Sequence, residues 1–541
     1  MSATFPNAPH SSDVGRRYVA AAVQTGVGGV LSRVLQGITP IILARYLGPK
    51  QYGVYALVLS LVGIMAGLSP LGQDTALEKF LPEYHVKNPA RGGAILANTV
   101  ILFSGALAVL CAGFFLAAPW IARAVYHDAA LERVFQFSAL LVLVMALFNL
   151  ASSAVAGLQG FKAYSLAMIV RGAAFLAFGW LGVWLLGFYG ALWGQLGAGL
   201  AGLTLLAVAA VKRAHARFGG FVRPQFTRDL GREIFGLALP AFLTGLVVMP
   251  AIWWANTLLA RHAGFAEVGI FSVAFSLMQL ILLVPCNLSV PAVSFFSEAH
   301  ASGQPQRFGG LVGDNFRLIW AITLPIAVGF AIFSRPVILL LFGRQYEGAA
   351  ALLVAMSLAG VMMILNSVVV NACIGRGYLW QAFLFHLGWL GLFLAIGNTL
   401  IRAWGATGLA CAFLLSYAPL ALGAAVYAAK VLGAQFTKVS PLLALTVLAY
   451  AATLALHLGS RRVPAQLGLG GVVLLVLLVG EWNWVLDARE RAVVELRCSR
   501  LTAAGTERRS ALWRFSVHAD EIPADTEGCR WLRSESGLSG E

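Results

Sequence analysis

The sequence predicts an all-α integral membrane protein with about 14 transmembrane helices, arranged as two parallel six-helix repeats plus two C-terminal helices. Three observations predict this fold class: the composition, the series of long apolar segments and an internal repeat. Of the 541 residues, 59% are hydrophobic and 11% are charged, and the mean hydropathy is +0.80. Soluble proteins carry about 25% charged residues. A soluble chain of this composition would expose large apolar patches.

The apolar segments justify the individual helices, because about 20 apolar residues are needed to span a bilayer. Windows of that length predict spans at 19–43, 54–75, 94–117, 134–158, 164–186, 189–211, 234–259, 268–290, 316–341, 351–373, 379–400, 406–428, 441–458 and 467–486. The connections between them are short and polar.

Lysine and arginine in the short connections predict the topology, since positive loops stay on the cytoplasmic side. Loop 212–233 is the strongest marker, with Lys212, Arg213, Arg217, Arg223, Arg228 and Arg232. The predicted organisation is a cytoplasmic N-terminus (1–16), an N-lobe (17–211), the basic cytoplasmic loop (212–233), a C-lobe (234–430), two additional transmembrane helices (440–486) and a cytoplasmic, largely disordered tail (487–541). Both termini are then cytoplasmic. Topology explains the net charge of +15, so we expect no nucleic-acid partner.

An internal repeat relates the two lobes. At a spacing of 216 residues the matched pairs are Arg45 with Arg261, Gly48 with Gly264 and Gly53 with Gly269; at 217, Pro119 matches Pro336; at 215, Tyr189-Gly190-Ala191 matches Trp404-Gly405-Ala406. Each lobe contains an even number of helices, so both keep the same orientation. This is the parallel-repeat arrangement of transporters, in which two halves rock around a central site.

Enzyme chemistry is not indicated. The chain contains no GxSxG, Walker A or HExxH motif, and we therefore expect no catalytic residues. The six cysteines are scattered without a CxxC pair, so no metal site is expected. A membrane glycan polymerase or ligase is the alternative from another functional class. The short loops count against it, because such enzymes usually need a sizeable extramembrane domain.

One segment carries a family resemblance. Residues 44–55, ARYLGPKQYGVY, resemble the first periplasmic turn of the polysaccharide biosynthesis transporters. These are the Wzx-type oligosaccharide flippases of the multidrug/oligosaccharidyl-lipid/polysaccharide exporter superfamily. Three further segments fit the same family: Leu68-Ser69-Pro70-Leu71-Gly72, Phe235-Gly236-Leu237-Ala238-Leu239-Pro240 and Gly343-Arg344-Gln345-Tyr346. The likeness covers about 17–430, and the long polar tail departs from it.

The resemblance implies a flippase in the bacterial inner membrane. It would translocate polyprenyl-pyrophosphate-linked oligosaccharide units for O-antigen, capsule or exopolysaccharide synthesis by alternating access, alongside polymerase or assembly proteins. No cofactor is expected. Without an ATP site, an H⁺ or Na⁺ gradient or the downstream removal of product would supply the energy. A lipid II flippase and a multidrug/cation antiporter of the same superfamily stay open as alternatives.

An anionic lipid-linked glycan needs cations and polar groups inside the membrane, where buried charges are costly and usually functional. The predicted substrate-binding residues are Arg33, Gln24, Gln36, Arg171, Arg317 and His386. Arg33 leads, because guanidinium pairs well with phosphate and Gln24 and Gln36 lie at helical spacings from it. Arg33 is expected in the outer half of the first span, where the alternatives are snorkelling toward the outer interface or a bond to helix carbonyls. The alternative for the other arginines is snorkelling, and for His386 it is a structural hydrogen bond.

Four further residues are candidates for gating or ion coupling. Arg45 and Arg261 occupy matched outer turns, where either gating or a structural role fits. Asp74 and Glu78 lie one helical turn apart at the predicted inner end of the second span. Such a carboxylate pair suits Na⁺ or H⁺ coupling, and an interfacial charge cluster is the alternative.

Overall fold

The computed structural model describes residues 11–69, 73–218, 247–289, 292–301, 305–436, 438–459 and 463–485. The described residues form helices and connections without any strand, as the fold class predicts. The chain divides into two compact units, Met1–Leu478 and Val479–Glu541. All packing discussed below lies within the first unit.

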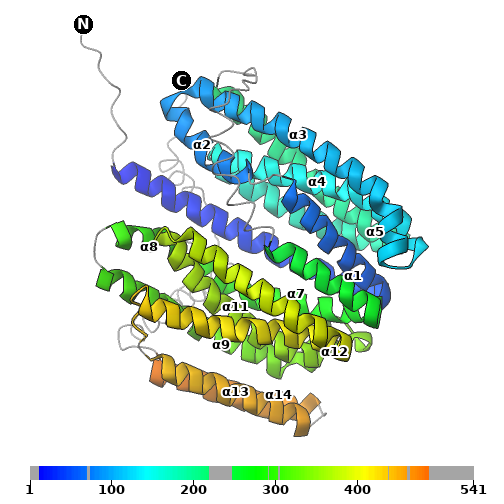
Figure 1. Ribbon diagram of the computed structural model, residues 1–541, viewed down its shortest axis with the longest axis vertical. Coiled ribbons are helices and arrows are strands. Elements are labelled where there is room, and N and C mark those ends of the chain that lie inside the picture. Colours follow the sequence, from blue (N-terminus) through cyan, green and yellow to red (C-terminus); the bar gives the residue numbers. More distant parts are fainter. Residues whose placement is uncertain are drawn as a thin grey trace, which may run out of the picture. The chain divides into compact units, whose positions relative to one another are not determined.

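The N-lobe consists of five helical elements. They are α1 (Ser11–Leu68), α2 (Gln73–Lys87), α3 (Pro89–Trp120), α4 (Glu132–Gly157) and α5 (Phe161–Phe218). A π-turn, η1 (Ile121–Val125), and a 3₁₀ turn, η2 (Ala129–Leu131), connect α3 to α4. Within this lobe α5 packs against α1 and α4, and α3 packs against α4 (Figure 1).

The C-lobe repeats this order. After the helical residues 247–263 come α7 (Phe265–Ser289), α8 (Ala292–Ala301), α9 (Pro305–Ile332), α10 (Ser334–Leu341), η3 (Arg344–Tyr346), α11 (Ala349–Gly375) and α12 (Leu379–Lys430). Two further helices and a short π-turn follow: α13 (Val439–Gly459), α14 (Val463–Gly480) and η4 (Glu481–Val485). The α13 helix packs on α9, where Trp320 Nε1 donates to Thr446 Oγ1 at 3.1 Å.

The prediction of 14 transmembrane helices is confirmed. Within the described residues, ten helices are long and apolar enough to cross a membrane. Three of these, α1, α5 and α12, are each broken by a glycine with non-helical dihedral angles and so supply two segments apiece. The helical residues 247–263 complete the set.

The glycine breaks confirm the repeat and correct its register. Gly48 and Gly264, matched by sequence, both have positive φ, at 71° and 89°. The equivalent breaks in α5 and α12 are Gly187 (φ 56°, ψ −129°) and Gly405 (φ 56°, ψ −130°). The predicted match of Gly190 with Gly405 is therefore wrong by three residues. In a uniformly apolar helix pair, short sequence identities do not fix the register.

Two predicted spans have different boundaries in the structure. The second span, expected over 54–75, ends at Leu68, and the separate helix α2 follows. Asp74 and Glu78 therefore lie on α2 and not on a spanning helix, because Pro70 and Gly72 interrupt the apolar run. The span expected over 316–341 begins earlier, at Pro305, and is divided into α9 and α10. The start of the seventh span, most of the basic loop and the tail 487–541 lie outside the described residues.

Candidate functional site

The two lobes meet most closely at one end of the α1–α7 contact. A Cβ on Gly53 would overlap the carbonyl oxygen of Phe265, and a Cβ on Gly269 would overlap that of Pro49. The two backbones therefore touch directly, as small residues permit in membrane helices. Gly53 and Gly269 are a matched pair of the repeat, so the contact joins equivalent points of the two lobes. We call this pair the glycine seam.

Two tyrosines flank the seam, one from each lobe. Tyr346, fully buried in η3 of the C-lobe, donates from its hydroxyl to the carbonyl oxygen of Ala44 on α1 at 2.9 Å. Tyr126, in the N-lobe connection after η1, lies with its hydroxyl 2.8 Å from Thr257 Oγ1 of the C-lobe. Ala44 corresponds in the repeat to Ala260, three residues beyond Thr257. Each lobe thus hydrogen-bonds through a tyrosine to the first helix of the other lobe.

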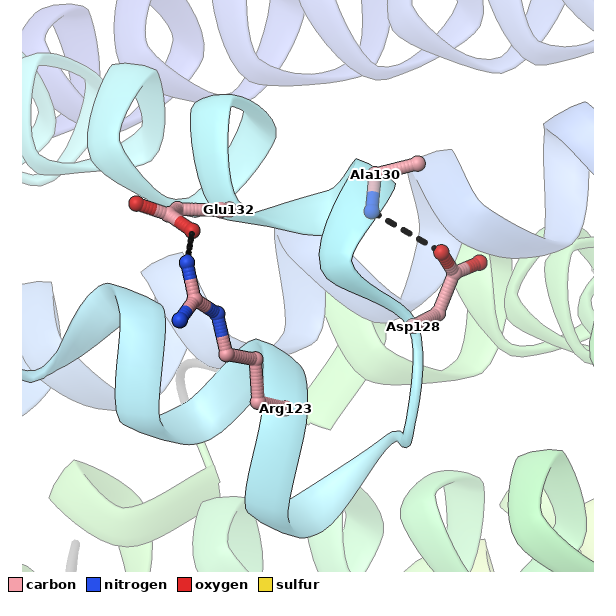
Figure 2. A network of polar contacts seen from close by, with 4 residues as sticks. All are labelled: Arg123, Asp128, Ala130 and Glu132. Carbon is pink, nitrogen blue, oxygen red and sulfur yellow. Dashed lines mark hydrogen bonds and ion pairs between the residues drawn. The ribbon is translucent and has the colours of Figure 1, made fainter.

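The connection that carries Tyr126 is itself held in place. Figure 2 shows Arg123 directed at Glu132, with Nη2 and Oε2 2.8 Å apart, and Asp128 capping the next turn by accepting from the backbone N–H of Ala130 at 2.9 Å. The cap satisfies a helix N–H that would otherwise lack a partner. We refer to the region of the glycine seam and the two tyrosines as the closed end.

Of the two matched outer arginines, one contacts the opposite lobe. Arg45 Nη2 donates to the carbonyl oxygen of Leu340, and Gln345 Nε2 donates to the Arg45 carbonyl at 3.2 Å. Both contacts join α1 to the C-lobe at the closed end. Arg261 is exposed. Equivalent positions in the repeat therefore have different surroundings, and a gating role for either arginine stays a prediction.

Arg33 lies farther along the same face of α1. Residues 33, 37 and 44 fall within about 40° of one another on a helix with 3.6 residues per turn. Gly37 lies against Leu280 of α7, with a Cβ position 3.0 Å from Leu280 Cδ2, and Ala44 is bonded to Tyr346. Arg33 is one turn beyond Gly37 and its side chain is exposed. The guanidinium therefore lies on the side of α1 that faces the C-lobe, about 20 Å along the helix from the closed end.

Two side chains from other elements lie within electrostatic range of Arg33. Its charge acts on the hydroxyl of Tyr164 in α5 and on the thiol of Cys286 in α7. The charge of Glu78 in α2 acts on the same Tyr164 hydroxyl. We call Arg33, Glu78, Tyr164 and Cys286 the interlobe site. It combines a cation suited to phosphate with a carboxylate that acts on the same tyrosine hydroxyl. The binding role of Arg33 and the coupling role of Glu78 stay predictions.

Of the two glutamines predicted to share a polar face with Arg33, Gln36 is the one whose side chain is described. Gln36 is half-buried and donates from Nε2 to Ser32 Oγ at 2.7 Å, while Ser32 donates to the Met168 carbonyl at 2.8 Å. This chain ties α1 to α5, so Gln36 contributes to packing. The side chains of Gln24 and Asp74 lie outside the described ones. Their roles stay predictions.

Arg171 lies inside the N-lobe. Its guanidinium is centred 4.3 Å from the ring centre of Phe148, and Nη2 is 3.0 Å from Met145 Sδ. Stacking on an aromatic ring is a favourable environment for guanidinium. These contacts are all to α4, so the structure gives Arg171 surroundings within the N-lobe and does not bring it into the interlobe site.

Arg317 and His386 are also engaged within their own elements. Arg317 is buried on α9, with Nη2 3.6 Å from Asp314 Oδ1 one turn earlier. His386 Nδ1 lies 2.9 Å from the Ala382 carbonyl of the same helix. Both contacts are those of structural residues, and a direct role in substrate binding stays a prediction for each.

Sequence reasoning missed three residues at these positions: Tyr126, Tyr164 and Cys286. A signal existed for the outer tyrosine Tyr346, which belongs to the Gly343–Tyr346 segment that resembles the transporter family. Nothing comparable marks the others, because a single tyrosine or cysteine in an apolar helix carries no periodic pattern.

The fold is shared with known membrane transporters. The structure matches "Lipid II flippase MurJ, inward closed conformation" with a TM-score of 0.66 and 14% identity, over 84% of this chain and 98% of that one. It matches a multidrug resistance MATE family transporter of the MOP superfamily, in an inward-facing conformation, with a TM-score of 0.63 and 13% identity, over 74% of this chain and 94% of that one. A MOP superfamily transporter from Pyrococcus furiosus gives 0.55 and 15%, over 76% and 95%.

Sequence comparison identifies the family. No curated protein sequence matches the chain. The polysaccharide biosynthesis protein family matches residues 42–351, which is more than half of the chain and includes the ARYLGP turn, the glycine seam and both tyrosines of the closed end. The chain therefore belongs to the polysaccharide biosynthesis protein family.

Proposed function

We propose that this protein is a flippase that carries polyprenyl-pyrophosphate-linked oligosaccharides across the bacterial inner membrane for surface polysaccharide synthesis. The family assignment supports polysaccharide synthesis as the process, and the transporter fold supports translocation as the mode of action. With the N-terminus in the cytoplasm, the closed end faces the periplasm and Arg33 lies toward the cytoplasmic side. The substrate would then enter from the cytoplasmic leaflet.

The position of Arg33 is the single observation that carries the proposal. An exposed guanidinium on the lobe-facing side of α1 would lose free energy in contact with lipid, so it belongs in a water-accessible path. A pyrophosphate is the part of the substrate that a guanidinium recognises best, through charge-assisted, often bidentate hydrogen bonds. The lipid tail needs no such partner, because it stays in the bilayer.

The interlobe site also suggests how transport is coupled. Glu78 and Arg33 both act on the Tyr164 hydroxyl, so Glu78 would compete with the substrate phosphate for the charge of Arg33. Protonation or Na⁺ binding at Glu78 would relieve that competition and favour substrate binding. The ion and the substrate would then bind cooperatively and move in the same direction, so downstream removal of the product would supply the energy for export and the ion gradient would only modulate it.

Deletion of the gene in its native host tests the proposal directly. We expect a lipid-linked oligosaccharide to accumulate on the cytoplasmic leaflet, as measured by mass spectrometry of extracted lipids and by protection from periplasmic glycosidases. Accumulation of lipid II instead would favour the cell-wall alternative. Sensitivity to cationic drugs without any lipid accumulation would contradict the flippase function and favour an antiporter.

Complementation of the deletion strain tests the role of Arg33. We expect Arg33→Ala to reduce export about 10- to 100-fold, because a charge-assisted hydrogen bond contributes about 1.5–3 kcal/mol. Arg33→Lys should retain part of the activity, since it keeps the charge and loses the planar fork. Immunoblots of membranes control for expression. Full export by Arg33→Ala would remove Arg33 from the substrate path.

A further inference from the structure

The closed end holds the lobes together by direct backbone contact. At the glycine seam, the backbone of α1 at Pro49–Gly53 lies against that of α7 at Phe265–Gly269 without a side chain between them. Any side chain larger than a hydrogen on Gly53 would overlap the Phe265 carbonyl. The seam therefore exists only while both positions are glycine, and it occurs where the repeat brings equivalent residues together.

The hydrogen bonds beside the seam are neutral and buried. Tyr346 is 0% exposed and Tyr126 is 8% exposed, and both hydroxyls bond to the opposite lobe. Tyr52 adds an edge contact to Tyr346, with ring centres 6.2 Å apart, and its hydroxyl bonds to Ser276 of α7. Neutral hydrogen bonds contribute modestly in net terms, because water replaces them when they open.

These features suit a contact that must open and close repeatedly. Close packing of two smooth backbones excludes water and small solutes from the closed state. Separation breaks the two tyrosine hydrogen bonds and the exposed contacts of Arg45 and Gln345. Among the described residues, no buried ion pair has to be broken at the seam or at the two tyrosines. An ion pair at this depth would be costly to break and to form again.

We propose that the Gly53–Gly269 seam and the Tyr126–Thr257 and Tyr346–Ala44 hydrogen bonds form one latch, which closes the periplasmic end and opens in each cycle to release the glycan. The inference rests on the proposed function for the direction of release only. The residues of the latch are positioning residues, because they set the relative position of the lobes and do not touch the substrate.

Accessibility of a single cysteine tests the latch. The reporter is Ala44→Cys in a chain whose six native cysteines are replaced, labelled in spheroplasts with a membrane-impermeant maleimide. Ala44 is fully buried at the closed end, so labelling of the reporter should be slow. Adding Gly53→Ala should raise the labelling rate by more than about tenfold and reduce export in parallel, because overpacking against a backbone oxygen cannot be relieved by a side-chain shift.

A second glycine of α1 provides the control. Gly63 lies on the same helix, and a Cβ there meets no atom within 4 Å. Gly63→Ala should therefore leave the labelling rate and export unchanged. Equal labelling rates in Gly53→Ala and Gly63→Ala, with normal export in both, would overturn the latch.

Removal of one hydroxyl gives a second test that does not risk misfolding. Tyr346→Phe should raise the labelling rate about fivefold, the change expected from loss of one neutral hydrogen bond. Tyr46→Phe is the matched control, because Tyr46 is 56% exposed. An unchanged rate in both Tyr346→Phe and Tyr126→Phe would contradict a role for the tyrosines. The labelling assay needs no substrate. If the variants label as expected but deletion of the gene causes no lipid-linked glycan to accumulate, the latch stands and the proposed function fails.

Discussion

The two ends of the α1–α7 interface hold the lobes in different ways. At the closed end, Gly53 and Gly269 bring backbone against backbone and the flanking tyrosines make neutral hydrogen bonds. At the other end, Arg33 is exposed and within electrostatic range of Cys286 and Tyr164. The seam and the tyrosine hydrogen bonds of the closed end are uncharged, and Arg45 adds an exposed contact to Leu340 there. The other end presents charge without close contact. Under the proposed function, this difference would separate closing from binding along a single pair of helices.

An aspartate introduced at either of two points of α7 should show the largest difference between the two ends. Ser276 lies at the closed end and Cys286 near Arg33, about 15 Å apart along the helix. Ser276→Asp should weaken the closed state, because Ser276 is half-buried beside Tyr52 and a carboxylate there loses much of its hydration. The labelling rate of the Ala44→Cys reporter should then rise by at least as much as with Gly53→Ala. Cys286→Asp should leave labelling unchanged, since Arg33 can pair with it, and should reduce export about tenfold by competing with the substrate.

Neutral variants separate charge from size in this experiment. Ser276→Asn and Cys286→Asn have nearly the same volume as the aspartates and carry no charge. We expect Ser276→Asn to change the labelling rate less than Ser276→Asp does. We expect Cys286→Asn to reduce export less than Cys286→Asp does. If Cys286→Asp opened the closed end as much as Ser276→Asp, the two ends would not be independent, and the division between closing and binding would be wrong.

A smaller effect is expected at Glu78. Glu78→Gln removes the negative charge that acts near Arg33, so the apparent affinity for an anionic substrate should rise about two- to fivefold, as for a partly screened charge pair. Transport in proteoliposomes should also lose its response to an imposed pH or Na⁺ gradient. A gradient response equal to that of the parent protein would exclude Glu78 as the coupling residue, and Asp74→Asn would be the next variant to measure.

The smallest effect is expected where α1 is fixed within its own lobe. Ser32→Ala removes the hydrogen bond to Met168 and should lower the free energy of unfolding by about 0.6 kcal/mol, the mean for such bonds in membrane proteins. Export should change less than twofold, as measured by complementation. Ser60→Ala, which loses only a bond to Leu57 of the same helix, is the control for the general effect of removing a hydroxyl. A large loss of export in Ser32→Ala would place binding function on the lobe-internal face of α1.

Composition and the repeat predicted most of the fold. The pair Gly48 and Gly264 was matched by sequence and both residues have positive φ, because glycine is required there and leaves a recognisable mark. The register that the sequence predicts around Gly405 is wrong by three residues, because Gly187 and not Gly190 is the equivalent position. The surrounding helices are apolar on all sides, so a shift of three residues changes no visible pattern, and only the backbone angles identify the equivalent positions.

The candidate site was predicted in part. A charge in an apolar helix is conspicuous, so Arg33 could be singled out, and helical spacing placed it on a defined face. Its neighbours Tyr164 and Cys286 come from other elements, and the packing of distant helices cannot be read from periodicity alone. Arg171 shows the limit of the same reasoning, since an equally conspicuous arginine has its contacts within the N-lobe on Phe148 and Met145.

The breaks at Gly187 and Gly405 have a consequence for chirality. Their angles, φ 56° with ψ −129° and −130°, are close to the mirror image of the polyproline II conformation, a region that L-residues avoid and glycine enters freely. A D-alanine placed at either position by chemical ligation would adopt these angles without strain, whereas L-alanine would not. At these two bends the membrane protein uses glycine as the genetically encoded substitute for a residue of the opposite hand.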